Sequence, residues 1–118
     1  MTRILVDTDV LAAHLRGERR FDPGDAEVYV STITRAELLA GQTSDDGPIM
    51  RLLEATREVP LEAAVVERGG KIRRVAGVRL GDALIAASAI EHELMLITAN
   101  IWAFREIEGL DAMAPPLA

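Results

Sequence analysis

The chain has 118 residues, no cysteine and a formal net charge of −6 at pH 7. Its length indicates one domain, and the lack of cysteine excludes a disulfide framework and a thiolate metal site. The acidic balance argues against binding nucleic acid through bulk charge, although a local arginine patch can still hold phosphates. Nearly half of the residues are hydrophobic, so a real core is available.

No membrane or export segment stands out in the sequence. No apolar run approaches the roughly 18 residues of a membrane-spanning helix. The N-terminus has the pattern of a strand rather than of a signal peptide. We therefore expect a soluble, cytoplasmic protein.

The first apolar stretch, Ile4-Leu5-Val6, runs directly into Asp7-Thr8-Asp9. A short, continuously apolar run before a helical pattern is typical of a strand buried on both faces. We expect Asp9 or Thr8 to cap the following helix and Gly17 to end it. Ligands of open α/β sheets bind at the carboxyl ends of the strands, so the question is whether further acids join this pair.

Strands and helices alternate along the rest of the chain, separated by loops rich in Pro, Gly, Ser and Asp. The Gly69-Gly70 pair is expected to weaken the middle of the longest helix. The expected strands cover residues 3–7, 27–31, 94–98 and 110–113, and residues 58–61 are expected to form a short extended piece. The expected helices cover residues 9–17, 33–41, 49–55, 62–75, 79–93 and 100–106. This alternation predicts a single three-layer α/β domain over residues 1–118, with a mostly parallel sheet.

Two helical acids border apolar faces. Glu37 lies roughly 40° around its helix from Ile33, beside the apolar stripe, and a carboxylate there needs a partner because burying an unpaired charge is costly. Asp82 lies in line with Ile85 and Ala86, and therefore points along the buried face. The ordinary interpretations are a solvated Glu and an Asp that stabilises a first helical turn.

The end of the strand at 94–98 carries two more oxygen-bearing side chains, Thr98 and Asn100. They emerge at a strand end as Asp7 and Asp9 do. A turn followed by an Asn-capped helix explains them about as well as a role in a site.

Together these residues suggest a metal site. Carboxylates packed together repel one another and need a cation, and oxygen ligands suit Mg²⁺ or Mn²⁺. Such ions polarise phosphoryl oxygens and lower the pKa of bound water, which implies phosphodiester hydrolysis. Arg73, Arg74 and Arg79 are candidate phosphate contacts, with solvated arginine as the alternative. His14 and His92 are interpreted as surface or packing residues.

The chain contains, in this order, I-L-V-D-T-D-V-L, T-R-A-E-L-L-A-G, G-D-A-L-I-A-A-S-A and L-I-T-A-N. These segments resemble the PIN-domain family, and more narrowly the VapC toxins of VapBC type II toxin–antitoxin pairs. The resemblance implies a Mg²⁺- or Mn²⁺-dependent endoribonuclease in which Asp7, Glu37 and Asp82 are the catalytic metal-site acids. It also implies an RNA substrate, a homodimer and a VapB-like antitoxin that blocks the acidic site.

The chain departs from the family pattern at one corner of this expected site. The family often has a fourth acid after the last core strand, where this chain has Ala103 or the neutral Asn100. Asn100, Thr98 and Asp9 then form a possible secondary site, although Asp9 is expected to act mainly as a helix cap. RNA specificity would lie in loops such as 18–27 and 42–48.

Two other functions remain open at this stage. Asp7-Thr8-Asp9-Val10 also fits the Asp-x-Asp-x-Val opening of haloacid-dehalogenase-like phosphatases, in which the first Asp is a nucleophile. That chemistry needs a later lysine, and Lys71, the only lysine, lies within a helical pattern. Alternatively, without its fourth acid the chain could be an inactive PIN scaffold that only binds a partner.

Overall fold

The computed structural model describes residues 2–41 and 43–116, so Gln42 in the predicted loop 42–48 lies outside it. Its five strands form one parallel sheet in the order β3-β2-β1-β4-β5. The strands are β1 (Arg3–Val6), β2 (Glu27–Ser31), β3 (Arg57–Val59), β4 (Met95–Ile97) and β5 (Ala112–Met113). The helices are α1 (Thr8–Leu15), α2 (Thr32–Ala40), α3 (Gly47–Glu54), α4 (Ala63–Ala76), α5 (Leu80–Glu91) and α6 (Ile101–Phe104).

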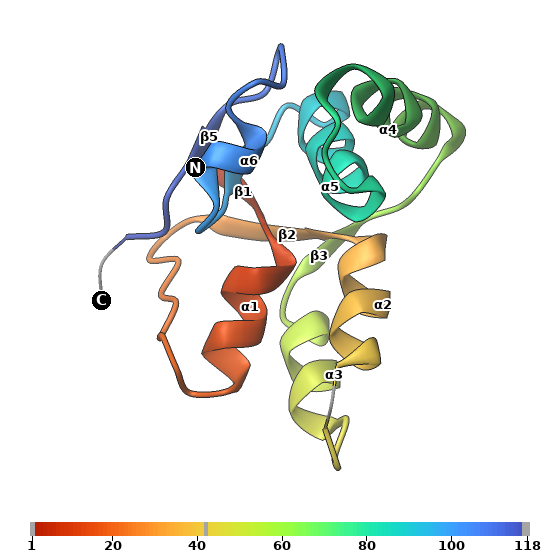
Figure 1. The fold of residues 1–118 in the computed structure, drawn as a ribbon. Helices are drawn as coiled ribbons and strands as arrows, with labels where there is room; N and C mark the ends of the chain where they lie inside the picture. The colour runs from red at the N-terminus through yellow and green to blue at the C-terminus, as the bar shows by residue number, and fades with distance from the viewer. Residues whose placement is uncertain (1, 42, 117–118) are drawn as a thin grey trace.

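Helices cover both faces of this sheet, which confirms the predicted three-layer α/β architecture. Figure 1 shows α1, α2 and α3 on one side and α4 and α5 on the other. Successive strand residues point to opposite faces, so Ile4 and Val6 belong to the first core and Leu5 to the second. Asp7 keeps an extended backbone (φ −66°, ψ 148°), and this alternation therefore directs its side chain to the face of Leu5 and α5.

The predicted cap of α1 is wrong. The N-cap residue is Asp7, its side chain makes no capping hydrogen bond, and Asp9 lies in the first helical turn. The chain turns from strand into helix one residue earlier than expected, and the Asp7 carboxylate bonds elsewhere. The end of α1 is as predicted, with Gly17 at a left-handed φ of 73°.

The segment 18–25, predicted as a polar loop, contributes to the core. Phe21 is buried with only 8% of its surface exposed. Its backbone N–H donates to Nδ1 of His14 at 3.0 Å. His14 thus holds the loop against α1, in agreement with the prediction of a packing role.

The glycine pair of α4 does not interrupt the helix, which runs unbroken to Ala76. Gly69 is buried, and a Cβ on it would stand 2.7 Å from Cδ2 of Leu84 on α5. Gly70 is exposed and has open space around it. Gly69 therefore permits the close approach of α4 and α5.

None of the helices in the described part of the chain has the length and apolarity to cross a bilayer.

Matched alanine substitutions test this packing. Gly70→Ala should raise the free energy of unfolding by about 1 kcal/mol, because alanine favours the helix interior over glycine. Gly69→Ala gains the same propensity but overpacks the contact with Leu84, at a cost of about 1–3 kcal/mol, and should lower stability. Denaturant unfolding of both variants measures this, and equal stabilisation by the two would contradict the close helix contact.

Candidate active site

A buried polar row crosses the sheet at its carboxyl edge. The register that pairs Val6 with Ile97 places Asp7 next to Thr98 on β4's side, and Ser31 ends β2 on the other side. The exposed fractions of Asp7, Ser31 and Thr98 are 3%, 0% and 0%. Thr98 Oγ1 donates to Asp7 Oδ2 at 2.7 Å, which fixes the carboxylate in the middle of the row.

The environment of Asp7 opposes its negative charge. Burial raises the pKa of the Asp7 carboxyl to about 6, because the charged form loses hydration. The Thr98 hydrogen bond acts in the opposite direction, and the negative charges of Asp9 and Asp82 raise the pKa further. Asp9 and Asp82 are therefore close enough to Asp7 for the three charges to interact.

Glu37 reaches the same region from α2. Its Oε1 accepts a hydrogen bond from Thr8 Oγ1 at 2.6 Å, and Thr8 Oγ1 lies 2.9 Å from Thr34 Oγ1. Its Oε2 lies 2.9 Å from the point where a Cβ on Gly81 would stand. The expectation that Glu37 needs a polar partner is confirmed, and Glu37 contacts the first turns of both α1 and α5.

Asp82 stands in the first turn of α5 and pairs with Arg79. Arg79 Nε lies 3.5 Å from Asp82 Oδ2, and the two side chains are 77% and 16% exposed. The Asp82 hydrogen bond and charge, with smaller contributions from Asp9 and Glu37, raise the pKa of Arg79 above its ordinary value. Arg79 is thus the cation nearest these acids among the three arginines predicted as phosphate contacts.

Arg73 and Asn100, two further residues singled out in the sequence, make contacts close to them in the chain. Arg73 Nη1 donates to the carbonyl of Val78 at 2.6 Å and so braces the α4–α5 turn. Asn100 caps α6, its Oδ1 accepting from the N–H of Ala103 at 3.4 Å. The Asn100 N–H donates to Thr98 Oγ1 at 3.1 Å. Asn100 therefore touches the polar row through Thr98, while its side chain serves the helix.

Asp9 lines two cavities, one on each side of it. The first, of about 440 Å³, also contains Thr8, Glu37, Arg16 and Arg79 among its lining residues. The second, of about 330 Å³, is lined in addition by Ala99, Arg19, Arg20 and Phe21, among others. Arginines thus lie on both sides of the exposed acid, together with the acids Glu18 and Asp45. Arg16 already pairs with Glu18 at 2.9 Å in an exposed contact, which a phosphate can replace.

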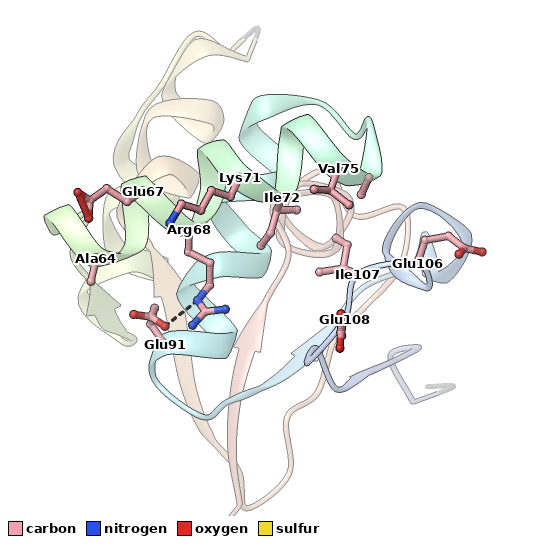
Figure 2. A pocket seen from close by; sticks show the side chains of 11 residues that line it. Ala64, Glu67, Arg68, Lys71, Ile72, Val75, Glu91, Glu106, Ile107 and Glu108 are labelled. Atoms are coloured by element: carbon pink, nitrogen blue, oxygen red, sulfur yellow. Dashed lines mark hydrogen bonds and ion pairs between the residues drawn. The ribbon is translucent and has the colours of Figure 1, made fainter.

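A further cavity, of about 520 Å³, lies along α4 beside the end of α5 and the segment 106–108 (Figure 2). Its lining includes the ion pair of Arg68 with Glu91, 2.7 Å apart. Lys71 lies in this cavity rather than beside Asp7. The phosphatase hypothesis requires a lysine next to its nucleophile, so this placement removes its support.

The acids fit a hydrated divalent cation better than a fully ligated one. Within residues 2–41 and 43–116, no three His, Cys, Asp or Glu side chains gather closely enough to ligate one ion directly. Mg²⁺ usually keeps several waters and takes only one or two carboxylates. Asp7 and Asp82, whose charges interact, supply two such carboxylates, and Glu37 lies beside the first turn of α5 that carries Asp82.

Four hydroxyl residues of this region were not predicted. Thr8 and Thr34 support Glu37, and Ser88 on α5 donates to Ser31 at 3.2 Å. The sequence did carry a signal for Ser31, because β1, β2 and β4 each end with three apolar residues and then a polar one. The contacts of Thr8, Thr34 and Ser88 depend on how the helices pack.

A parallel sheet whose central strand ends in a buried Asp, with acids from two neighbouring helices, defines an α/β domain with an acidic site at its carboxyl edge. The PIN domain family model matches residues 4–110. The chain belongs to the PIN-domain family, as the four sequence motifs suggested.

The chain is also similar to individual proteins of known name or structure. The chain is 36% identical to Ribonuclease VapC10 of Mycobacterium tuberculosis, over 98% of this chain and 93% of that protein. A toxin–antitoxin complex from Klebsiella pneumoniae contains a chain 26% identical to this one, with a TM-score of 0.81 and coverage of 98% and 99%. VapBC2 from Rickettsia felis, bound to a promoter DNA fragment, shares the fold with a TM-score of 0.83 at 18% identity, covering 98% and 100%.

The burial of Asp7 predicts a pH-dependent stability. Between pH 3.8 and about 6 the folded chain holds a proton that the unfolded chain releases, so stability falls as pH rises through this window. Asp7→Asn removes the charge, and should be more stable than wild type at pH 7.5 by up to about 3 kcal/mol, with the difference disappearing near pH 4. Denaturant unfolding in chelator at several pH values measures it, with the exposed Asp111→Asn as matched control. A difference that is constant with pH would contradict the buried charge.

Proposed function

We propose that the chain is a Mg²⁺- or Mn²⁺-dependent ribonuclease that acts as the toxin of a type II toxin–antitoxin pair. The observation that carries this proposal is the buried Asp7 carboxylate, whose charge interacts with those of Asp9 and Asp82. The 36% identity to Ribonuclease VapC10 supports RNA as the substrate.

Each proposed metal-site acid is positioned by a neighbouring side chain. Thr98 holds Oδ2 of Asp7, and Thr8 holds Oε1 of Glu37. Arg79 orients Asp82 through an exposed contact that is easily broken. When bound through these acids, directly or through water, a divalent ion supplies charge to polarise a phosphoryl oxygen and to activate a water.

The arginines around Asp9 complete the proposed site. Arg79 and Arg16 line one cavity, and Arg19 and Arg20 line the other. Guanidinium groups bind phosphate oxygens in a bidentate manner. We assign these side chains to neighbouring phosphates of the RNA, which lets a chain of net charge −6 hold a polyanion locally.

The secondary site is proposed to depend on Asp9 rather than on Asn100. Asp9 is exposed between the two cavities and acts electrostatically on Asp7. The Asn100 side chain is engaged in capping α6. Asp9 thus supplies negative charge to a site that lacks the family's fourth acid.

Cleavage assays with purified protein test the ribonuclease proposal. With Mn²⁺ or Mg²⁺ the wild type should cut single-stranded RNA, and chelator should stop it. Asp7→Asn and Asp82→Asn should each lower the rate by at least about 100-fold. Thr98→Val should lower it by about 10- to 100-fold, because the Thr98 hydroxyl orients the Asp7 carboxylate. Asp111→Asn is the control that keeps its activity. Equal activity of Asp7→Asn and wild type would contradict the role proposed for Asp7 in the metal site.

A non-catalytic scaffold is the second candidate, favoured by the engaged Asn100 and by the absence of a directly ligating triad in the described residues. Calorimetric titration with Mn²⁺ separates the two. Binding that is lost in Asp7→Asn supports the nuclease. No binding to the wild type supports a scaffold that only recognises a protein partner.

The proposed partner is a VapB-like antitoxin, and the proposed assembly contains a homodimer of this chain. The acids at the carboxyl edge suit an arginine of the partner, which would pair with them in place of a metal. The structural relatives include toxin–antitoxin complexes, which supports this choice.

Co-expression tests the partner. The product of a small reading frame beside the gene should co-purify with this chain, suppress its RNA cleavage, and elute with a mass that includes two copies of the chain. Light scattering on the eluted complex gives that mass. Recovery of the chain alone and fully active from such co-expression would contradict the antitoxin proposal.

A further inference from the structure

Trp102 differs from the other aromatic residues of this chain in its exposure. The chain has only four aromatics, Trp102, Tyr29, Phe21 and Phe104. Both phenylalanines are buried and Tyr29 is partly buried, whereas Trp102 exposes 71% of its surface. An exposed tryptophan gains little for folding, so its position points to a contact with another molecule.

Hydrogen bonds connect the helix of Trp102 to the acidic site. Asp7 is bonded to Thr98, Thr98 to the N–H of Asn100, and the Asn100 side chain to the N–H of Ala103. Trp102 is four residues beyond Thr98, so their Cα atoms are at most about 14 Å apart. A ligand that reaches Asp7 therefore needs only a few further units to reach Trp102.

Arg105 turns the tryptophan into a charged stacking surface. Its guanidinium carbon lies 3.9 Å from the centroid of the Trp102 ring, which is the geometry of a cation–π contact. Arg105 covers one face of the ring, and the high exposure of Trp102 leaves the opposite face open. Arg105 also lies 3.4 Å from Glu106 in an ion pair with both side chains exposed, so its charge stays accessible.

One cavity beside Asp9 reaches the residue before the cap of α6, and its lining includes two arginines and Glu18. The cavity of about 330 Å³ contains Asp9, Arg19, Arg20 and Ala99. Ala99 directly precedes Asn100, the cap of α6. A single strand in this cavity would place phosphates near Arg19 and Arg20 and would lie beside Ala99, three residues before Trp102.

We propose that Trp102, with Arg105 stacked on its ring, is the platform on which a base of the single-stranded RNA stacks a few nucleotides from the cleaved bond. The proposal rests on the ribonuclease function proposed above. Aromatic side chains bind single strands because every base has a stacking face. Stacking needs no net positive charge, which suits an acidic protein.

The single tryptophan makes the test direct, because all tryptophan fluorescence comes from Trp102. The full chain carrying Asp7→Asn, without metal, is titrated with a single-stranded oligoribonucleotide of mixed sequence. Stacking should quench the fluorescence as RNA binds. In parallel, anisotropy of labelled RNA should show about tenfold weaker binding when Trp102→Leu is added, and a smaller loss with Trp102→Phe.

Cleavage kinetics on the metal-loaded protein give the second readout. Trp102→Leu should raise KM about tenfold and leave kcat within about twofold, because the platform lies away from the reacting phosphate. Trp102→Phe should restore most of the loss. Val75→Ala, a change at an 85% exposed apolar residue of α4, is the control that alters neither constant.

The outcomes separate this proposal from the nuclease proposal. Unchanged RNA affinity and KM in Trp102→Leu, or no quenching on binding, overturns the platform even if cleavage is normal. Loss of antitoxin binding with unchanged RNA affinity overturns it in favour of a protein contact. Quenching and weakened binding in a chain that cuts no RNA supports the platform and contradicts the ribonuclease.

Discussion

The pairing of β1 with β4 is the constraint on which the site depends. It brings Thr98 beside Asp7, and their 2.7 Å hydrogen bond holds a carboxylate that burial would otherwise protonate or displace. Leu5 packs on the face of the sheet that α5 covers, and the alternation of strand side chains turns Asp7 toward the same helix. Asp82 lies in the first turn of that helix. The β1–β4 register thus fixes Asp7 and Thr98, whereas Glu37 and Asp82 are placed by the packing of α2 and α5.

Much of this arrangement could be predicted from short patterns. Short patterns located four of the five strands, with β3 expected only as an extended piece, and the alternation of strands with helices predicted the layered sheet. Asp7 could be placed because a buried strand that ends in an acid leaves that acid at the carboxyl edge. The matching ends of β1, β2 and β4, each apolar until Asp7, Ser31 or Thr98, show that the sequence also encoded the polar row.

What could not be predicted depends on distances between elements. The cap of α1 was expected at Asp9 or Thr8 because both residue types favour that position, whereas the N-cap residue is Asp7. The partner of Glu37 is Thr8, 29 residues away, and nothing in either segment encodes that contact. Likewise, the sequence alone predicts that Gly69 weakens its helix. Its role depends on Leu84, which occupies the space that a side chain at position 69 would need.

Contacts within the chain offset only part of the repulsion between the acids of this site. The charges of Asp7, Asp9 and Asp82 repel one another, and this repulsion together with burial raises the pKa of Asp7 to about 6. Arg79 offsets part of the repulsion through its contact with Asp82, which is exposed on the arginine side and therefore weak. The proposed divalent ion or partner arginine would have to displace only this weakly held cation, whereas a tightly buried pair would keep the acids engaged. The structure thus balances the acids only enough to let them remain available to a ligand.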